Sequence, residues 1–166
     1  MPLITTERLL IRFVDDSDLD FIFEIVNSPG YIQFIGDNRV RSKEHAKAYI
    51  MNGPKTSYQQ YGFGLFHVSL KSTGEAIGLA GLTKREYLSF PELGYALLPR
   101  YWGNGYAKEA AKAVVDWGYQ QMNIKRIMAL VKHDNPGSQS VLRSVGFKNV
   151  RDIAVPDEDE PMLLMG

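Results

Sequence analysis

Residues 92–107 read ELGYALLPRYWGNGYA, a strand followed by a glycine-containing loop and the start of a helix. The predicted strand stops at Pro99, which has no N–H to donate to a sheet. The first N–H groups of a helix have no acceptor within it, so a loop that leads into a helix can bind an anion. Gly103 and Gly105 favour this because glycine lets the backbone approach an anion closely and adopts positive φ. The R-x-x-G-x-G pattern therefore predicts a diphosphate site, with a tight turn that binds nothing as the alternative.

Two other phosphate-binding loops are excluded. A P-loop requires the pattern G-x-x-x-x-G-K-[ST], which does not occur in the chain. The dinucleotide fingerprint G-x-G-x-x-G requires a third glycine three residues after Gly105, where the chain has Lys108. Neither nucleotide-binding interpretation fits the residues.

Length and charge restrict the class of protein. The chain has 166 residues, enough for one domain with a full core, and we expect residues 1–166 to form a single domain. Its 19 basic and 19 acidic residues cancel. No overall charge therefore attracts nucleic acid or an anionic membrane, and we expect neither as a partner.

Composition also argues against metal and thiol chemistry. The chain has no cysteine, which excludes disulfides, thiolate metal ligands and a cysteine nucleophile. Its three histidines share no metal-ligand spacing, so we expect no metal site. The N-terminus resembles no signal peptide, and no apolar run approaches the roughly 20 residues that cross a bilayer. We therefore expect a cytoplasmic protein.

Periodicity and turn signals predict an α/β (α+β) fold. We expect a single mixed, mostly antiparallel sheet of six to seven strands, flanked by about four helices, with a central β-α-β unit. The predicted strands are residues 7–13, 62–70, 75–83, 90–98, 126–132, 148–155 and 161–165. The predicted helices are one that follows the capping residues 15–17, then 43–58, 107–122 and 136–145. The strand 126–132 is expected to run parallel to the strand that ends at Leu98.

Alternation divides the strand 90–98 into two faces. One face carries Leu93, Tyr95 and Leu97, and the other carries Glu92, Gly94, Ala96 and Leu98. The second face is mostly small, so we expect an extended ligand to lie against it. The carboxylate of Glu92 would then lie at its far end.

Three motifs in order resemble the GNAT superfamily of acyl-CoA-dependent N-acyltransferases. They are R-x-x-G-x-G-Y-A at 100–107, D-N-P-x-S at 134–138 and V-L-R-S-V-G-F at 141–147. The opening T-E-R-L-L-I-R-F, with D-x-x-D beyond it, is similar to the RimJ/RimL-like branch of that superfamily. The resemblance covers nearly the whole chain, from Thr5 to Gly166.

The resemblance implies a GNAT fold and an N-acetyltransferase that uses acetyl-CoA as co-substrate. It implies that the diphosphate lies on the loop formed by Gly103, Asn104, Gly105, Tyr106 and Ala107. It also implies that the backbone of Leu97, Leu98 and Arg100 pairs with the pantetheine amides, and that Asn135 and Ser138 face the other side of the pantetheine. A non-catalytic coenzyme A sensor or scaffold with the same loop is the alternative.

Attack on a thioester requires an amine to lose its proton. Glu92 is the candidate base, and the N–H of Leu98 is the candidate donor to the developing oxyanion. Many GNAT enzymes have a tyrosine four residues before the glycine that ends the last helix, whereas this chain has Leu142 there. Either Ser138 protonates the leaving thiolate, as resemblance to the RimL branch implies, or the thiolate leaves unaided.

The acceptor amine is not identified by the sequence. The acidic turn 157–160 would attract a cationic amine, or it is a solvated turn. A protein α-amine, a lysine, an aminoglycoside, a polyamine and an amino acid all remain open. The identity of the acyl donor is open as well, with succinyl-CoA as one alternative to acetyl-CoA. A homodimer is consistent with the family, although no stretch of this chain argues for one.

Overall fold

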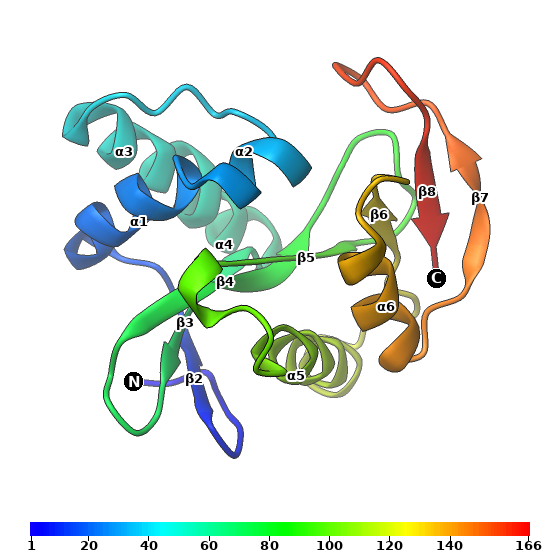
Figure 1. Cartoon of the computed structure of the whole chain (residues 1–166). Coiled ribbons are helices and arrows are strands. Elements are labelled where there is room, and N and C mark those ends of the chain that lie inside the picture. The colour runs from blue at the N-terminus through cyan, green and yellow to red at the C-terminus, as the bar shows by residue number, and fades with distance from the viewer.

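The computed structural model describes residues 1–166 and contains eight strands and six α-helices (Figure 1). The strands are β1 Ile4–Thr5, β2 Leu9–Arg12, β3 Leu65–Leu70, β4 Ala76–Thr83, β5 Glu92–Leu97, β6 Ala129–Val131, β7 Asn149–Ile153 and β8 Met162–Met165. The helices are α1 Leu19–Val26, α2 Pro29–Phe34, α3 Lys43–Ile50, α4 Thr56–Tyr61, α5 Tyr106–Gln121 and α6 Pro136–Ser144. Short 3-10 turns at Asp16–Asp18 and Pro99–Tyr101 precede α1 and follow β5.

The predicted α/β fold class is confirmed, but the strands form two sheets where a single sheet was expected. The larger is antiparallel with the order β1-β2-β3-β4-β5, and the smaller has the order β6-β8-β7. They meet at one parallel bridge, between Glu92 of β5 and Met128. The parallel direction expected for the strand after α5 is therefore confirmed. No further pairing follows beyond this bridge, because β6 spans only three residues and the chain then turns into α6.

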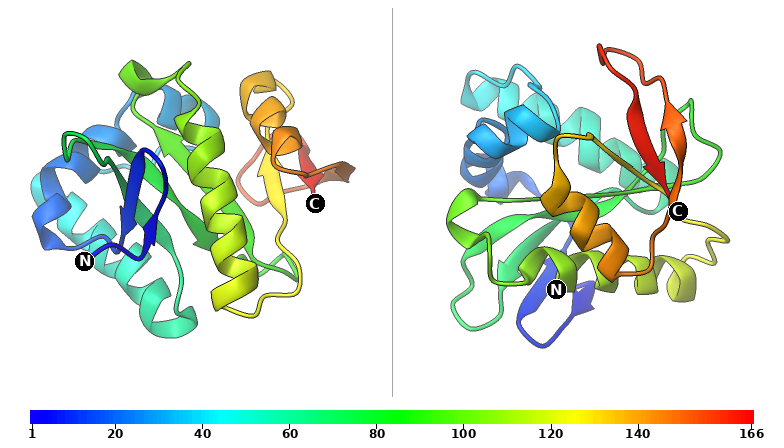
Figure 2. Two further views of the ribbon diagram at one scale, coloured as in Figure 1. Left: turned by 90° about the horizontal axis from the view of Figure 1, so that it is seen from below. Right: turned by 45° about the vertical axis from the view of Figure 1, so that its right-hand side comes forward.

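The larger sheet lies between two layers of helices (Figures 1 and 2). Helix α5 covers one face, where Leu93, Leu97 and residues of α5 share the larger apolar core. Helices α1 and α3 cover the other face, where Leu79, Leu98 and partly buried Ala96 join the second core. The face with small side chains is therefore largely covered by helices. The expectation that a ligand lies along this face is wrong for Leu98, which is buried, whereas Ala96 is only partly covered.

Helix α5 sits close to the sheet because its inner surface is small. Ala110, Ala111, Val114 and Gly118 are buried on this surface, as the helical spacing predicts. A Cβ at Gly118 would lie 3.0 Å from Ile127 Cδ1 and 3.2 Å from Leu82 Cδ1. Glycine at this position therefore sets the distance between helix and sheet.

The segment predicted as one helix, 43–58, is interrupted. Helix α3 ends at Ile50, a π-helical stretch spans Met51–Lys55, and α4 follows. Pro54 lies inside this stretch, and proline removes one helical hydrogen bond and crowds the preceding turn. The wider π turn accommodates it.

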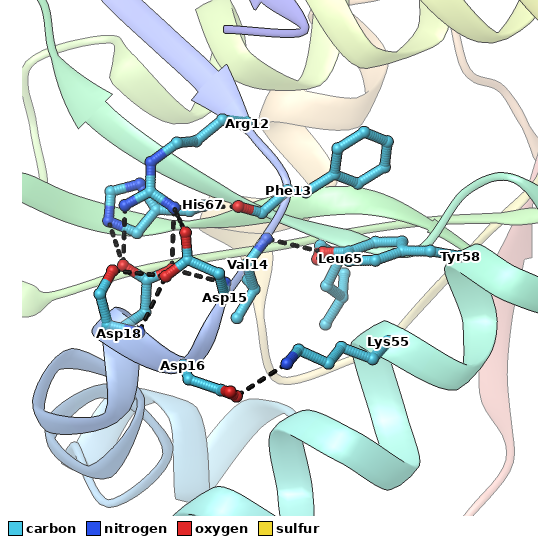
Figure 3. A network of polar contacts seen from close by, with 11 residues as sticks. Arg12, Phe13, Val14, Asp15, Asp16, Asp18, Lys55, Tyr58, Leu65 and His67 are labelled. Carbon is cyan, nitrogen blue, oxygen red and sulfur yellow. Dashed lines mark hydrogen bonds and ion pairs between the residues drawn. The ribbon is translucent and has the colours of Figure 1, made fainter. Parts of the chain in front are cut away.

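A buried polar cluster joins β2, β3 and the start of α1 (Figure 3). Both carboxylate oxygens of Asp18 accept from Arg12, at 2.8 and 2.7 Å, and the Asp15 N–H donates to Asp18 at 2.9 Å. Asp15 caps the 3-10 turn Asp16–Asp18 that leads into α1, which confirms the predicted cap. The Tyr58 hydroxyl accepts from the Val14 N–H at 3.1 Å and donates to the Leu65 carbonyl. The cluster attaches the layer formed by helices α1 to α4 to the larger sheet.

None of the helices combines the length and apolar character needed to cross a bilayer.

Candidate active site

The loop between β5 and α5 presents a series of unpaired backbone donors. Gly103 and Gly105 have φ of +78° and +79°, the left-handed conformation that favours glycine. Gly105 caps α5 without any side-chain hydrogen bond, and the first bond of the helix runs from the Glu109 N–H to the Gly105 carbonyl at 3.1 Å. The N–H groups of residues 103–108 donate to no protein acceptor. We call residues 103–108 the amide loop; they comprise the end of the β5–α5 connection and the first residues of α5. Consecutive unpaired N–H groups at a helix N-terminus fit an anion.

The amide loop is held by local contacts. The Asn104 side chain donates to the carbonyls of Tyr101 and Trp102 at 3.3 and 3.1 Å. The Trp102 indole donates to the Leu97 carbonyl at 3.0 Å. Asn104 therefore orients the loop through its side chain, while its N–H remains available. Arg100 lies in the turn before the loop, and its exposed side chain pairs with Glu24 of α1 at 2.7 Å. In this structure its guanidinium is directed to α1.

The edge of β5 that faces β6 carries further unpaired donors. Leu93 donates to the Met128 carbonyl at 2.7 Å across the bridge. Because hydrogen bonds alternate along a strand, the N–H groups of Tyr95 and Leu97 point the same way, and there β6 has separated from β5. The backbone of Leu97 therefore suits the predicted pantetheine contact. The Leu98 N–H points the other way and donates to the Ile77 carbonyl of the chain beside β5 at 2.9 Å. Its expected role as oxyanion donor is wrong, because the sheet already uses this N–H.

Asn135 and Ser138 lie together at the start of α6. The Asn135 side chain accepts from the Ser138 N–H at 3.2 Å and caps the helix, with Pro136 as the first helical residue. The hydroxyl groups of Ser138 and Tyr95 lie 2.7 Å apart. Burial raises the pKa of Tyr95 to about 12, although its hydrogen bond with Ser138 acts in the opposite direction. Tyr95 is therefore a neutral hydroxyl that connects β5 to α6 across the gap between the two sheets.

Tyr95 is absent from the sequence-based set of site residues. Alternation correctly assigns Tyr95 to the face that carries Leu93 and Leu97. The apolar residues of this face indicate a core, so the pattern gives no reason to place Tyr95 in a site. Its partner Ser138 is 43 residues away, so no local pattern joins the two hydroxyls. Leu142, at the position of the family's tyrosine, is buried in the larger core. The tyrosine hydroxyl nearest to Ser138 comes instead from a strand.

Glu92 lies at the base of the gap, where the two sheets still meet. Its side chain is 12% exposed and accepts from Arg85 Nε at 3.1 Å and from the Thr83 hydroxyl at 3.3 Å. Burial raises the pKa of Glu92, while the nearby Arg85 and the two hydrogen bonds oppose this shift. By alternation Glu92 is on the α1 to α4 side of β5, whereas Tyr95 is on the α5 side. A carboxylate and a pair of hydroxyls thus lie on opposite faces of one strand.

The acidic turn 157–160 is located on the α2 side of the gap. Lys132, just after β6, pairs with Glu158 of this turn at 3.5 Å and donates to the Gln33 carbonyl of α2 at 3.2 Å. Lys132 therefore connects the turn to α2 and offsets part of its charge. No group of three histidine, aspartate or glutamate side chains in the structure could hold a metal ion.

Comparison with known proteins finds acetyltransferases of similar sequence and fold. A family model described as "Acetyltransferase (GNAT) domain" matches residues 8–148. The "Uncharacterized N-acetyltransferase YnaD" of Bacillus subtilis is 30% identical over 145 residues, which cover 87% of this chain and 82% of that protein. An acetyltransferase structure from Agrobacterium tumefaciens matches with a TM-score of 0.83 and 25% identity, over 100% of this chain and 94% of the other. A structure of RimL, a ribosomal L7/L12 α-N-protein acetyltransferase in complex with coenzyme A, matches with a TM-score of 0.84. It is 17% identical and covers 99% of this chain and 96% of its own, so this likeness concerns the fold alone.

Proposed function

This chain belongs to the GNAT family of acetyltransferases, and from that premise we propose that it transfers the acetyl group of acetyl-CoA directly to a primary amine. The acceptor class is a protein N-terminus or a small-molecule amine. The RimJ/RimL-like motifs near residues 6–18 support the first of these, and so does the fold shared with a protein α-amine acetyltransferase.

One observation carries the proposal: the N–H groups of residues 103–108 have no protein acceptor. Consecutive N–H groups at a helix N-terminus bind phosphate oxygens well, since each group points outward and the helix dipole favours negative charge. In our proposal Gly103, Asn104, Gly105, Tyr106 and Ala107 bind the diphosphate. The backbone of Leu97 and the start of α6 at Asn135 and Ser138 contact the pantetheine.

The proposed reaction forms a C–N bond and breaks the C–S bond of the thioester. Glu92 removes the proton from the attacking amine, directly or through water. The unpaired N–H of Tyr95 or Leu97 takes over the oxyanion role that the Leu98 N–H cannot fill. Ser138, hydrogen-bonded to the Tyr95 hydroxyl, supplies the proton that the departing thiolate takes up.

The test is acetyl transfer to a mixed library of amines and peptides, read by mass shift and by release of free thiol from acetyl-CoA. We expect both signals, and we expect them to be lost in Gly105→Val. A β-branched side chain at a φ of +79° is strained and distorts the amide loop. Binding of coenzyme A without acetylation of any acceptor would support the sensor or scaffold in place of the enzyme. Absence of coenzyme A binding by the wild-type protein would refute both.

A further inference from the structure

Arg8, in the turn between β1 and β2, contacts both ends of the amide loop. Its Nη1 donates to the Asn104 carbonyl at 2.9 Å, although the two residues are 96 positions apart in the sequence. Its Nε donates to Glu109 Oε1 at 2.7 Å, and its backbone N–H donates to Glu109 Oε2 at 2.9 Å. Asn104 lies near the start of the loop, and Glu109 directly follows its last residue. One side chain therefore spans the loop.

Thr6 completes the attachment of Glu109. Its hydroxyl donates to Glu109 Oε2 at 2.6 Å and accepts from the Leu9 N–H at 3.0 Å. Both carboxylate oxygens of Glu109 are thus held by the β1–β2 turn, and its side chain is 19% exposed. Burial acts to raise the pKa of Glu109, but the hydrogen bonds from Thr6 and Arg8 outweigh it and lower the pKa. Glu109 is therefore an anion bound at fixed geometry.

The charges explain why such an attachment matters for an anion site. An unpaired carboxylate in the first turn of α5 would favour the helix but repel a diphosphate. Arg8 pairs with the Glu109 carboxylate and balances its charge, so no net negative charge lies beside the loop. Its Nη2 donates to no protein group and lies 3.4 Å from the position that a Cβ at Gly105 would occupy. The cation is thus beside the backbone that carries the free N–H groups. It also lies over the Tyr106 ring, 4.4 Å from its centroid.

We propose that Arg8 is a positioning residue for acyl-CoA binding: by bonding to Asn104 and Glu109 together, it holds the N–H groups of residues 103–108 in the arrangement that receives the diphosphate. This inference rests on the proposed function and extends it, because it assigns a role in the site to the T-E-R-L opening of the chain. The effect is on binding, since the polar contacts of Arg8 are with Asn104 and Glu109 and not with Glu92 or Ser138.

The first test compares coenzyme A affinity and turnover in four proteins. These are the wild type, Arg8→Ala, Arg8→Lys and the control Arg151→Ala, which removes an equal charge from the exposed strand β7. We expect Arg8→Ala to raise the Kd for coenzyme A by about tenfold or more, because two charge-assisted bonds that order the loop are lost. The kcat at saturating acetyl-CoA should change less than about twofold, since Arg8 acts through the loop. Thermal unfolding confirms that each variant is folded.

The lysine variant separates geometry from charge. Lysine keeps the positive charge but is a point donor that cannot reproduce the planar fork of arginine. We therefore expect Arg8→Lys to bind coenzyme A nearly as weakly as Arg8→Ala. We also expect that adding Glu109→Gln to Arg8→Ala does not restore affinity. Full affinity in Arg8→Lys or in the double variant would show that charge alone matters, and it would overturn the positioning role. Wild-type affinity in Arg8→Ala would overturn it as well.

The second test needs no ligand, so it stays informative if coenzyme A does not bind. Nitrogen-15 relaxation of the Gly103 and Gly105 amides should report an ordered loop in the unliganded wild type and in Arg151→Ala, and a more mobile loop in Arg8→Ala. Equal order in all three proteins would refute the positioning role. A mobile loop in Arg8→Ala, with no coenzyme A binding by the wild type, would instead refute the proposed function and leave the role of Arg8 in place.

Discussion

Glu92 is a carboxylate whose protonation decides the pH range of activity in the proposed mechanism. Its pKa is raised by burial, so Glu92 takes up its proton at a higher pH than an exposed glutamate does. As the pH falls through this raised pKa, the base is lost and kcat/KM declines. We expect Glu92→Gln to remove this acidic limb and to lower kcat by about 10²- to 10⁴-fold, the usual contribution of a general base.

The matched control is Glu86→Gln, because Glu86 is an exposed acid in the β4–β5 connection. Glu86→Gln should retain both the decline of kcat/KM at low pH and the wild-type kcat. A pH–rate profile measured on all three proteins decides the assignment. An unchanged limb in Glu92→Gln would direct attention to Asp157, Glu158 or Glu160, or to a reaction without a protein base.

Ser138 and Tyr95 form one hydrogen-bonded unit, and we predict that they act together on the leaving thiolate. Ser138→Ala should lower kcat by about tenfold and should change the Kd for coenzyme A less. This loss is smaller than the usual general acid effect of about 10²- to 10⁴-fold, because the thiol of coenzyme A is a tolerable leaving group. Tyr95→Phe removes the hydroxyl that orients Ser138 and should lower kcat in the same direction. Because both variants break the same contact, the double variant should be less impaired than the product of the two effects. Wild-type turnover in Ser138→Ala would remove the role.

At the scale of elements, the packing of α5 on the sheet determines where the amide loop lies. Even a Cβ at Gly118 would crowd Ile127 and Leu82, so a large side chain there would push the helix outward. We expect Gly118→Leu to reduce the free energy of unfolding by about 1–3 kcal/mol, the cost of overpacking a core. It should also weaken coenzyme A binding, since α5 begins at the loop.

Chemical denaturation of Gly118→Leu beside Gly53→Ala tests this prediction. A Cβ at Gly53 would meet no atom within 4 Å, and the residue lies in a helical segment without positive φ. Alanine there should leave stability unchanged or raise it, because alanine favours helix. A fully stable Gly118→Leu would contradict the account of α5 packing.

At the scale of the whole molecule, the two sheets share one bridge, and the N–H groups that line their gap come from β5 and the amide loop. A ligand that pairs with these groups binds only the folded chain. We expect coenzyme A at roughly one hundred times its Kd to stabilise the protein by about 2.7 kcal/mol. For a chain of this length that corresponds to a rise in Tm of roughly 5–10 °C.

Thermal unfolding with coenzyme A, and with adenosine as a ligand that lacks the diphosphate, measures this effect. Adenosine should leave Tm unchanged, and Gly105→Val should show no rise with either compound. An equal rise with adenosine would mean that the amide loop contributes little to binding.

The sequence alone determined the order of the main strands and helices and the backbone conformation of the amide loop. The conformation of Gly103 and Gly105 and the start of the helix at Pro136 were predicted correctly, because positive φ and the start of a helix depend on neighbouring residues. The α/β class followed from periodicity for the same reason. Pro54 is also a local signal for the interruption after α3, although the prediction of a single helix over 43–58 did not use it.

Only the tertiary structure decided which groups face the gap. The orientation of the Leu97 and Leu98 N–H groups depends on how β5 pairs with β4 on one side and leaves β6 on the other. The contacts of Tyr95 with Ser138 and of Arg8 with Asn104 join residues 43 and 96 positions apart. Periodicity shows which face of an element a residue occupies, but the residue it meets there depends on how distant segments pack together.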